Sequence, residues 1–303
     1  IEGCHDVAGS GICGIQFLGI PGSIGVKILN NTIHGSSLGI YFKHCNGDTS
    51  LSTGAEIAYN HFYDCTKYAI SGNPVYVNIH DNLFAGEGVD RGDGRKDCAL
   101  FLGLNAGGIP MGNHNIVNHN TFYKTGLYQD NSAGCITYTN VTNNIFMALT
   151  VPAASRDSSA PHYTTLDYNL YIPDTALAEY GQGYTLDEWI AHYGGDAHSI
   201  AGIPTFVGGG NPSSLSDFAL ANGSLGRNAA ADGTDLGANL ALVGPQDPVT
   251  FNHPPVLSTI GNRSVQAGQE IQFTVEASDA DGDARNYSAT ALQIEDTTFP
   301  TQD

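Results

Sequence analysis

The chain has 303 residues, of which 41% are hydrophobic, 14% are charged and 38 are glycine, so it can bury a sizeable core in one large or two ordinary domains. Its 30 acidic and 11 basic residues give a formal net charge of −19, which argues against a nucleic-acid partner or an anionic membrane surface. No apolar run reaches the length of a membrane span, so membrane insertion is not expected.

A sequence pattern that consists of an apolar strand, an asparagine and a second apolar strand recurs along the chain. It reads VKILNNTIHG at 26–35, IAYNHFYDC at 57–65, VNIHDNLFAG at 77–86, IVNHNTFYKTG at 116–126, VTNNIFMAL at 141–149 and LDYNLYIPD at 166–174. The repeated residues are Asn31, Asn60, Asn82, Asn120, Asn144 and Asn169, spaced by 29, 22, 38, 24 and 25 residues. This drifting period predicts a stacked coil with loops inserted at some turns.

Each repeat also contains a further short strand that follows a glycine or another small residue. These strands are GIQF at 14–17, GIYF at 39–42, AISG at 69–72, ALFLG at 99–103 and GCITY at 134–138. Aliphatic residues such as Ile28 and Ile79 suit an interior in which each coil stacks on the last. An asparagine at one corner of every coil can hydrogen-bond to the asparagines above and below it.

These repeats resemble the right-handed parallel β-helix proteins of the pectate-lyase-like superfamily, whose asparagine ladder occupies one turn. The stretch TLDEWIAHYGGDAHSIAGIPTFVGGG, followed by LSDFALANGSLGRNAAADGTDLGA, resembles the closing segment of bacterial secreted members. The resemblance implies an all-β fold: a right-handed parallel β-helix (solenoid) with a C-terminal capping segment over residues 1–242. Because the superfamily includes lyases, hydrolases, epimerases, adhesins and structural fibres, it does not fix the chemistry.

The capping segment contains a short predicted helix near 185–193. Thr185 and Glu188 have the spacing of a capping box, and Gly194 is placed to end the helix. The apolar stripe consists of Leu186, Trp189, Ile190 and Tyr193. We expect this helix and the turns after it to cover the open C-terminal end of the coil, with Trp189 buried; the alternative for Trp189 is a platform for a sugar ring.

A linker and a second module are predicted beyond the coil. Residues 243–255 are rich in proline and lack periodicity. Residues 256–303 resemble the start of a bacterial immunoglobulin-like or cadherin-like module, and since a full sandwich needs about 100 residues, we expect a partial β-sandwich from a longer protein. Asp279, Asp281 and Asp283 alternate around a glycine and predict a structural Ca²⁺ site, with an empty acidic turn as the alternative.

Cysteines and histidines give weaker signals. The six cysteines match no zinc template, and disulfides such as Cys45–Cys65 or Cys4–Cys13 stay open beside simple burial. The histidines near the asparagine corners, His61, His80, His114 and His119, favour surface or ladder-capping roles over metal binding, because no HxxxH or HExxH helix is present.

In the resembled superfamily the working face is the further strand of each repeat with its flanking loops. The longest loops here span 43–54, 85–97, 103–115 and 124–134, and long insertions on one side of a solenoid build binding surfaces. The densest charge lies in Glu87, Asp90, Arg91, Asp93, Arg95, Lys96 and Asp97. Four acids beside three bases suit bound Ca²⁺ next to a cation that meets a uronate.

Three interpretations of these charges remain open. A lyase needs a base that removes the proton next to a sugar carboxylate, for which Lys43, His44, Arg95 and Lys96 are candidates. A glycoside hydrolase needs two carboxyl groups, available from Asp48, Asp90, Asp93 and Asp97. In the third interpretation the loop is a solvated, ion-paired turn without catalysis. We take Lys43, Asp93, Arg95, Lys96 and Asp97 as candidate catalytic residues, and His44, Asp48 and Arg91 as candidate substrate-binding residues.

The sequence therefore predicts an extracellular or cell-surface bacterial protein that engages polysaccharide, as a lyase or hydrolase of acidic glycans. The alternative is a structural or adhesive subunit of a fibre or surface layer. In that case copies of the chain would meet end to end, because an uncapped coil leaves the N–H and C=O groups of a whole rung unpaired.

Overall fold

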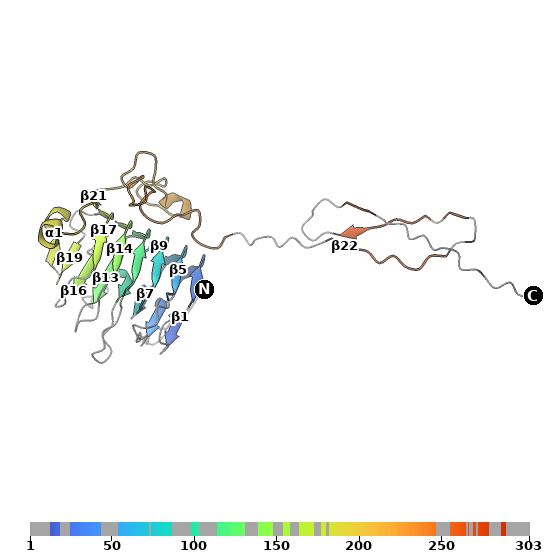
Figure 1. The fold of residues 1–303 in the computed structure, drawn as a ribbon, viewed down its shortest axis with the longest axis horizontal. Helices are drawn as coiled ribbons and strands as arrows, with labels where there is room; N and C mark the ends of the chain where they lie inside the picture. Colours follow the sequence, from blue (N-terminus) through green and yellow to red (C-terminus); the bar gives the residue numbers. More distant parts are fainter. Residues whose placement is uncertain are drawn as a thin grey trace, which may run out of the picture. The chain divides into compact units, whose positions relative to one another are not determined.

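The computed structural model describes residues 13–18, 25–43, 54–72, 74–86, 98–102, 114–130, 139–147, 154–157, 164–172, 177–179, 182–246, 255–264, 266, 269–270, 272–278 and 286–288. The chain divides into two compact units, residues 1–246 and 247–303. The first unit is a parallel β-solenoid, in which the chain passes through three sheets in turn (Figure 1).

Within the described residues, each of the three sheets of the solenoid takes every third strand of the chain, except that β20 follows β19 directly. The eight-stranded sheet contains β1 (Cys13–Leu18), β4 (Leu38–Lys43), β7 (Tyr68–Gly72), β10 (Cys98–Leu102), β13 (Gly126–Asp130), β16 (Ala154–Asp157), β19 (Leu177–Glu179) and β20 (Gln182–Tyr184). The six-stranded sheet contains β2 (Lys27–Leu29), β5 (Glu56–Ala58), β8 (Asn78–His80), β11 (Ile116–Asn118), β14 (Asn140–Thr142) and β17 (Thr165–Asp167). The seven-stranded sheet contains β3 (Thr32–His34), β6 (His61–Tyr63), β9 (Leu83–Ala85), β12 (Thr121–Tyr123), β15 (Ile145–Met147), β18 (Leu170–Ile172) and β21 (Ile200–Ala201). All neighbouring strands are parallel except β19 and β20.

The core is built from one inward residue at the centre of each three-residue strand, because side chains alternate between the two faces of a strand. In the six-stranded sheet this row is Ile28, Ile57, Ile79, Val117, Val141 and Leu166. In the seven-stranded sheet it includes a column of stacked rings, Phe62, Phe84, Phe122, Phe146 and Tyr171, whose centroids lie 4.7–5.6 Å apart. Each ring therefore packs on its equivalent in the next coil, at about the spacing of neighbouring strands.

The predicted asparagine ladder is present at the corner between the six- and seven-stranded sheets. Side-chain amides donate to the next side chain at 3.0–3.1 Å along the series Asn31, Asn60, Asn82, Asn120, Asn144 and Asn169. The residue before each ladder asparagine has a positive φ of 50–59°, so the chain turns the corner in two residues. Ser199 ends the ladder, because its hydroxyl accepts from the backbone N–H of Asn169 at 2.8 Å.

The segment expected to be a loop at 124–134 contains a strand. The series at 14–17, 39–42, 69–72 and 99–103 corresponds to β1, β4, β7 and β10, but the strand that pairs with β10 is β13, inside a segment expected to be a loop. Leu127 and Gln129 of β13 are buried while Tyr128 is less so, which is the alternation of a strand. The polar Gln129 at an inward position hid that pattern. Residues 134–138 lie outside the described residues.

The predicted capping helix is present as α1 (Leu186–Tyr193), which lies beside β19 in Figure 1. Both hydrogen bonds of the capping box form between Thr185 and Glu188, at 2.9 and 3.2 Å. Trp189 is only 2% exposed and packs with Tyr184 and Tyr193, so it is a core residue and not a sugar platform.

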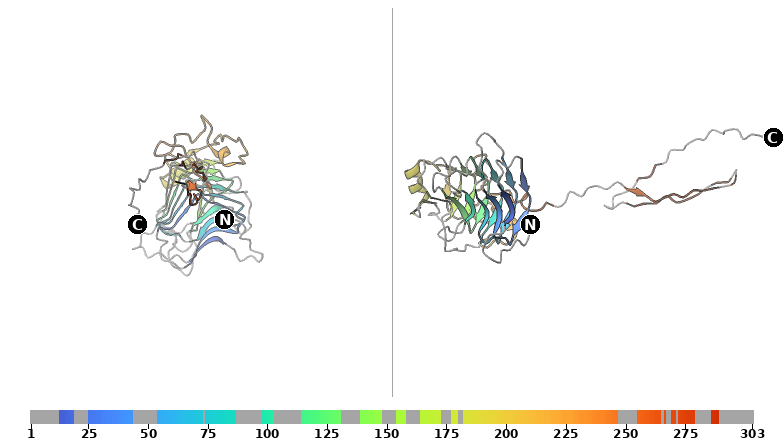
Figure 2. Two further views of the ribbon diagram at one scale, coloured as in Figure 1. Left: turned by 90° about the vertical axis from the view of Figure 1, so that its right-hand side faces the viewer. Right: turned by 90° about the horizontal axis from the view of Figure 1, so that it is seen from below.

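The segment after β21, residues 202–246, is named the strap here. It includes a short 3₁₀ helix, η1 (Leu215–Phe218). We expected the turns after α1 to cover the end of the coil, but the strap instead lies along the outer face of the seven-stranded sheet (Figures 1 and 2). That face is apolar, so the strap buries Phe206, Phe218, Leu220, Leu236 and Val243 against Leu83, Tyr123, Ile145, Leu170 and Ile172.

Backbone contacts fix the strap to several coils. Asn239 N–H donates to the Asp81 carboxylate at 3.0 Å, and Gly237 N–H donates to the Asn143 carbonyl at 2.9 Å. Farther along, the Asn30 amide donates to the Leu242 carbonyl at 2.6 Å. The strap thus bridges coils that lie far apart in the sequence.

In the second unit, the two-residue strands β22 (Val256–Leu257) and β23 (Ala277–Ser278) form an antiparallel pair. None of the described residues of this unit is buried. The unit begins at Asp247, inside the stretch expected to be a linker. Over the whole described part of the chain, no helix has both the length and the apolar character needed to cross a membrane.

Candidate functional site

Most of the residues chosen from the sequence lie outside the described residues. They are His44, Asp48, Arg91, Asp93, Arg95, Lys96, Asp97, Asp279, Asp281 and Asp283. Lys43 is the last residue of β4 and pairs with Leu18 of β1, but its side chain is also outside the description. Cys13 lies in β1 and Cys65 follows β6, whereas their suggested partners Cys4 and Cys45 are not described. These assignments therefore stay predictions.

The outer face of the eight-stranded sheet, where the working face was expected, is partly closed. Tyr41, Ser71, Phe101 and Tyr128 are in register across four strands. Phe101 stacks on Tyr128 at 5.4 Å, yet Phe101 and Ser71 are each only 1% exposed. The centre of this row is packing surface, so among the described residues it does not offer an open groove.

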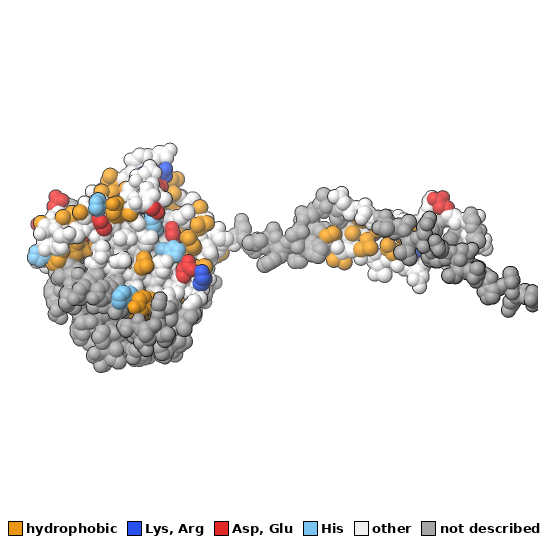
Figure 3. Space-filling model, in the orientation of Figure 1, with side chains coloured by type: hydrophobic (Ala, Val, Ile, Leu, Met, Phe, Trp, Pro, Cys, Tyr) orange, Lys and Arg blue, Asp and Glu red, His pale blue; other side chains and the backbone are white. Residues whose placement is uncertain are grey.

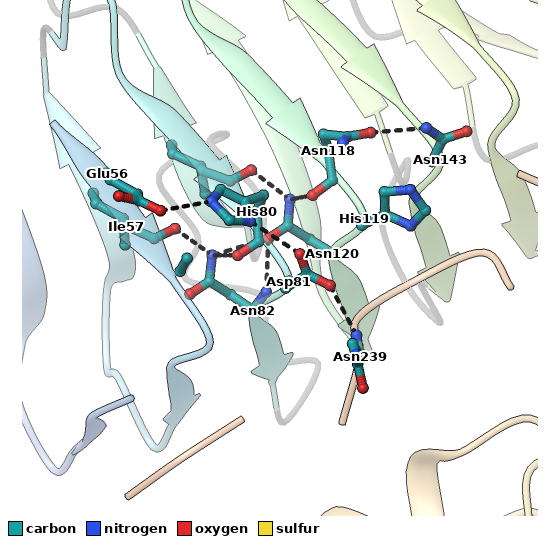
Figure 4. Close-up of polar contacts among 12 residues, drawn as sticks. Glu56, Ile57, His80, Asp81, Asn82, Asn118, His119, Asn120, Asn143 and Asn239 are labelled. Carbon is teal, nitrogen blue, oxygen red and sulfur yellow. Dashed lines mark hydrogen bonds and ion pairs between the residues drawn. The ribbon is translucent and has the colours of Figure 1, made fainter. Parts of the chain in front are cut away.

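A polar row lies on the outer face of the six-stranded sheet, beside the ladder. Strand register aligns one residue from each coil: Leu29, Ala58, His80, Asn118, Thr142 and Asp167. From the third coil onward every member carries a hydrogen-bonding group. We name this row from His80 to Asp167, together with its neighbours Glu56, Asp81, Tyr168 and His198, the corner track (Figure 4 shows its first half).

An ion-pair network occupies the first part of the corner track. His80 lies between two carboxylates, with Nδ1 2.9 Å from Asp81 and Nε2 3.3 Å from Glu56 (Figure 4). The Lys27 ammonium is 2.7 Å from the other oxygen of Glu56. The hydrogen bond to Asp81 does most to raise the pKa of His80, and the bond from Lys27 lowers the pKa of Glu56. Both ring nitrogens of His80 are thus engaged by carboxylates, so neither is free to meet a ligand.

The middle of the track is an uncharged amide and hydroxyl patch. The Asn118 side-chain oxygen accepts from the Thr142 hydroxyl at 3.1 Å and from the Asn143 amide at 2.9 Å. These bonds fix the side chains of Asn118 and Thr142 in neighbouring coils, and both are partly exposed, which leaves a surface suited to recognising hydroxyl groups.

The last part of the track holds a histidine–aspartate dyad. The Nδ1 atom of His198 is 2.8 Å from Asp167, whose other oxygen accepts from the backbone N–H groups of His198 and Tyr168. Partial burial acts to raise the pKa of Asp167, but the bonds from His198 and Tyr168 outweigh it and leave that pKa below its usual value.

The imidazole of this dyad is held in place but open to solvent. It stacks on Tyr168 at 4.6 Å and is 59% exposed. A carboxylate at Nδ1 favours the tautomer that carries its proton there, so Nε2 is the nitrogen available to a ligand or a proton. Sequence reasoning missed this dyad because its two members lie 31 residues apart, and only the coil brings them together.

The other histidines pack in different ways. Burial, with a smaller effect of His34, lowers the pKa of His61 to about 4. His114 stacks on Tyr76 at 4.9 Å, and His119 lies 3.4 Å from Asp232 of the strap. Across the described ranges, no cluster of three or more His, Cys, Asp or Glu side chains is arranged to hold a metal ion.

Comparisons with family models, with curated proteins and with solved structures return no match for this chain. The parallel β-solenoid is therefore established by the structure itself, and the function must be argued from the corner track and its surroundings.

Proposed function

We propose that this protein is a secreted, polysaccharide-engaging β-helix protein of the pectate-lyase-like type and that the corner track is its glycan-binding surface. The observation that carries the proposal is the register of the track, which offers one hydrogen-bonding side chain per coil from His80 to Asp167. Neighbouring coils are about 4.8 Å apart, a spacing comparable with one sugar unit of an extended chain. The repeat of sugar units along a glycan thus matches the repeat of hydrogen-bonding side chains along the track.

The charge of the track favours a neutral glycan. Glu56, Asp81 and Asp167 contribute three negative charges, and the ammonium group of Lys27 is ion-paired with Glu56. Figure 3 likewise shows acidic and histidine side chains with few lysines or arginines on the face in view. A polyanion would meet no excess of positive charge there.

Acidic glycans are a second proposed substrate class, and the residues that favour them lie in a different part of the chain. The charged segment at 85–97 contains Arg91, Arg95 and Lys96, which would locally oppose the net charge of −19. Lyase or hydrolase chemistry on a uronate, with Asp93 and Asp97 and with Ca²⁺ as the cation, would belong to that segment, and Lys43 at the end of β4 is the further candidate. At the corner track itself, His198 is the side chain placed to move a proton.

The test is a screen of the full chain against neutral and uronate-containing polysaccharides, with and without Ca²⁺, for binding and for released products. The proposal expects neutral polysaccharide to bind without Ca²⁺. His198→Ala should weaken this binding, whereas His192→Ala, an equally exposed histidine on α1, should leave it unchanged. Failure of every polysaccharide to bind or react would falsify the proposal.

A second candidate function, a structural or adhesive subunit, is favoured by the second unit. Its large apolar side chains are exposed, with Val256 at 67%, Phe273 at 45% and Tyr287 at 57%. The edge of an immunoglobulin-like sheet can be paired by a strand from another copy, and Ca²⁺ at Asp279, Asp281 and Asp283 would stiffen such a module. Sedimentation of the chain over a range of concentrations, with and without Ca²⁺, tests this: larger species support it, and a constant monomer contradicts it.

A further inference from the structure

A groove with a cavity volume of about 730 Å³ lies between the strap and the corner of the solenoid. Such a volume is within the range of sites for small ligands. The solenoid contributes Asp81, His119, Thr121 and Ile145, and the strap contributes Arg227 and Asp235 among others. Asp81 also belongs to the corner track, so the groove and the track are contiguous.

We infer that this groove, named the strap groove, binds one neutral sugar unit of the polysaccharide, an inference that rests on the proposed function. Its clearest feature is a fixed ion pair on the strap. The Nη1 atom of Arg227 lies 3.1 Å from Asp235 and donates to the Leu220 carbonyl at 3.3 Å. The other oxygen of Asp235 accepts from the backbone N–H of Asn228 at 3.0 Å. Both side chains are therefore oriented before a ligand arrives.

The remaining carboxylates of the groove are held in the same way. Asp232 accepts from the N–H and the hydroxyl of Thr234 at 3.0 and 2.6 Å, and its other oxygen is 3.4 Å from His119. Asp81 is fixed by the N–H of Asn239 on one oxygen and by His80 on the other. Apart from the Asp232 oxygen that accepts both bonds from Thr234, each of these carboxylate oxygens has a second lone pair with which it can accept from a sugar hydroxyl.

The lining selects the class of ligand. Asp81, Asp232 and Asp235 outnumber the single cation Arg227, so a uronate would be repelled. Ala238, Leu240 and Ala241, which are not buried, supply an apolar part of the wall, on which the C–H face of a sugar ring can pack. Fixed carboxylates for hydroxyl donors, a guanidinium for hydroxyl oxygens and an apolar wall together match an uncharged sugar.

The experiment is a calorimetric titration of the full chain with cellohexaose, xylohexaose and tetragalacturonate. Arg227→Met and Asp235→Asn each remove one member of the ion pair, and each should weaken neutral-sugar binding about tenfold. Arg263→Met is the matched control, because this arginine lies over Phe273 in the second unit. The control should bind like the parent, and tetragalacturonate should bind the parent more weakly than the neutral hexasaccharides do, and more weakly still after Arg227→Met.

A second measurement locates the ligand without a substitution. Bound neutral hexasaccharide should slow amide hydrogen exchange at residues 226–239 of the strap and leave residues 255–264 unchanged. Neutral-sugar binding that survives both groove variants, or that slows exchange only at the corner track, would overturn the groove while the proposed function stands. A parent chain that binds no glycan would instead overturn the proposed function.

Discussion

Removing one central amide of the ladder should destabilise the solenoid far more than removing one at its edge. The Asn82 side chain is fully buried and makes five hydrogen bonds. It accepts from the N–H and the amide of Asn60, and it donates to Ile57, His80 and Asn120 at 2.8–3.0 Å. Asn82→Ala removes all five of these bonds.

The magnitude follows from which groups lose their partners. The backbone N–H of Asn60 would stay buried without its acceptor, which costs about 1–3 kcal/mol. The Asn60 amide keeps its bonds to Ile28 and Ala58, so the remaining four contacts add about 2 kcal/mol together. We therefore expect Asn82→Ala to lower the free energy of unfolding by about 3–5 kcal/mol.

Two control variants complete this prediction. Among the described residues, the Asn31 side chain at the edge of the ladder donates to Leu29 and Asn60, so Asn31→Ala should cost about 1–2 kcal/mol. Asn211→Ala, at an exposed position of the strap, should cost close to nothing. Guanidinium unfolding of the three variants provides the measurement. Equal losses at Asn82 and Asn211 would refute the idea that the ladder holds the coils together.

Three further predictions concern the strap, the His80 network and the core. Because the pKa of His80 is raised in the folded state, the contacts of His80 should stabilise the fold below about pH 6.5, and this stabilisation should be lost as the pH rises through the folded pKa. The melting temperature of His80→Gln should therefore change less between pH 5.5 and 8.5 than that of the parent; an unchanged pH profile contradicts this. Phe122 stacks on Phe84 and Phe146 at 4.7 Å each, and Phe122→Ala should cost about 3–5 kcal/mol in chemical unfolding; a loss below about 1 kcal/mol would argue against tight packing of this column. Gly237 has a φ of 84°, and an added Cβ would lie 2.5 Å from the Thr121 hydroxyl, so Gly237→Ala should loosen the strap and make it more sensitive to limited proteolysis. Gly233 has a similar φ of 80° but open space around it, so Gly233→Ala should increase cleavage of the strap less.

The ladder and the capping helix could be predicted from the sequence because local sequence patterns specify both. One asparagine per coil, flanked by apolar residues, specifies a corner, and the spacing of Thr185 and Glu188 specifies the start of α1. By contrast, β13 contains the inward Gln129, whose polarity broke the expected apolar pattern.

The corner track and the strap groove could not be predicted, because their contacts join distant parts of the chain. Asn239 meets Asp81 across 158 residues, and His198 meets Asp167 only after a full coil. Sequence reasoning favoured the charged segment at 85–97 because its charges are adjacent in the chain. The residues of the track become neighbours only through strand register, which a single sequence does not display.

The most direct test of glycan binding at the corner track is retention of the full chain in native gels that contain a neutral polysaccharide. The parent and the control His192→Ala should be retarded, and retardation should be lost when His198 and Asp167 are both replaced by alanine while the far-ultraviolet circular dichroism stays unchanged. Equal retardation of the double variant and the parent, or no retardation of the parent by any neutral polysaccharide, would contradict the proposal.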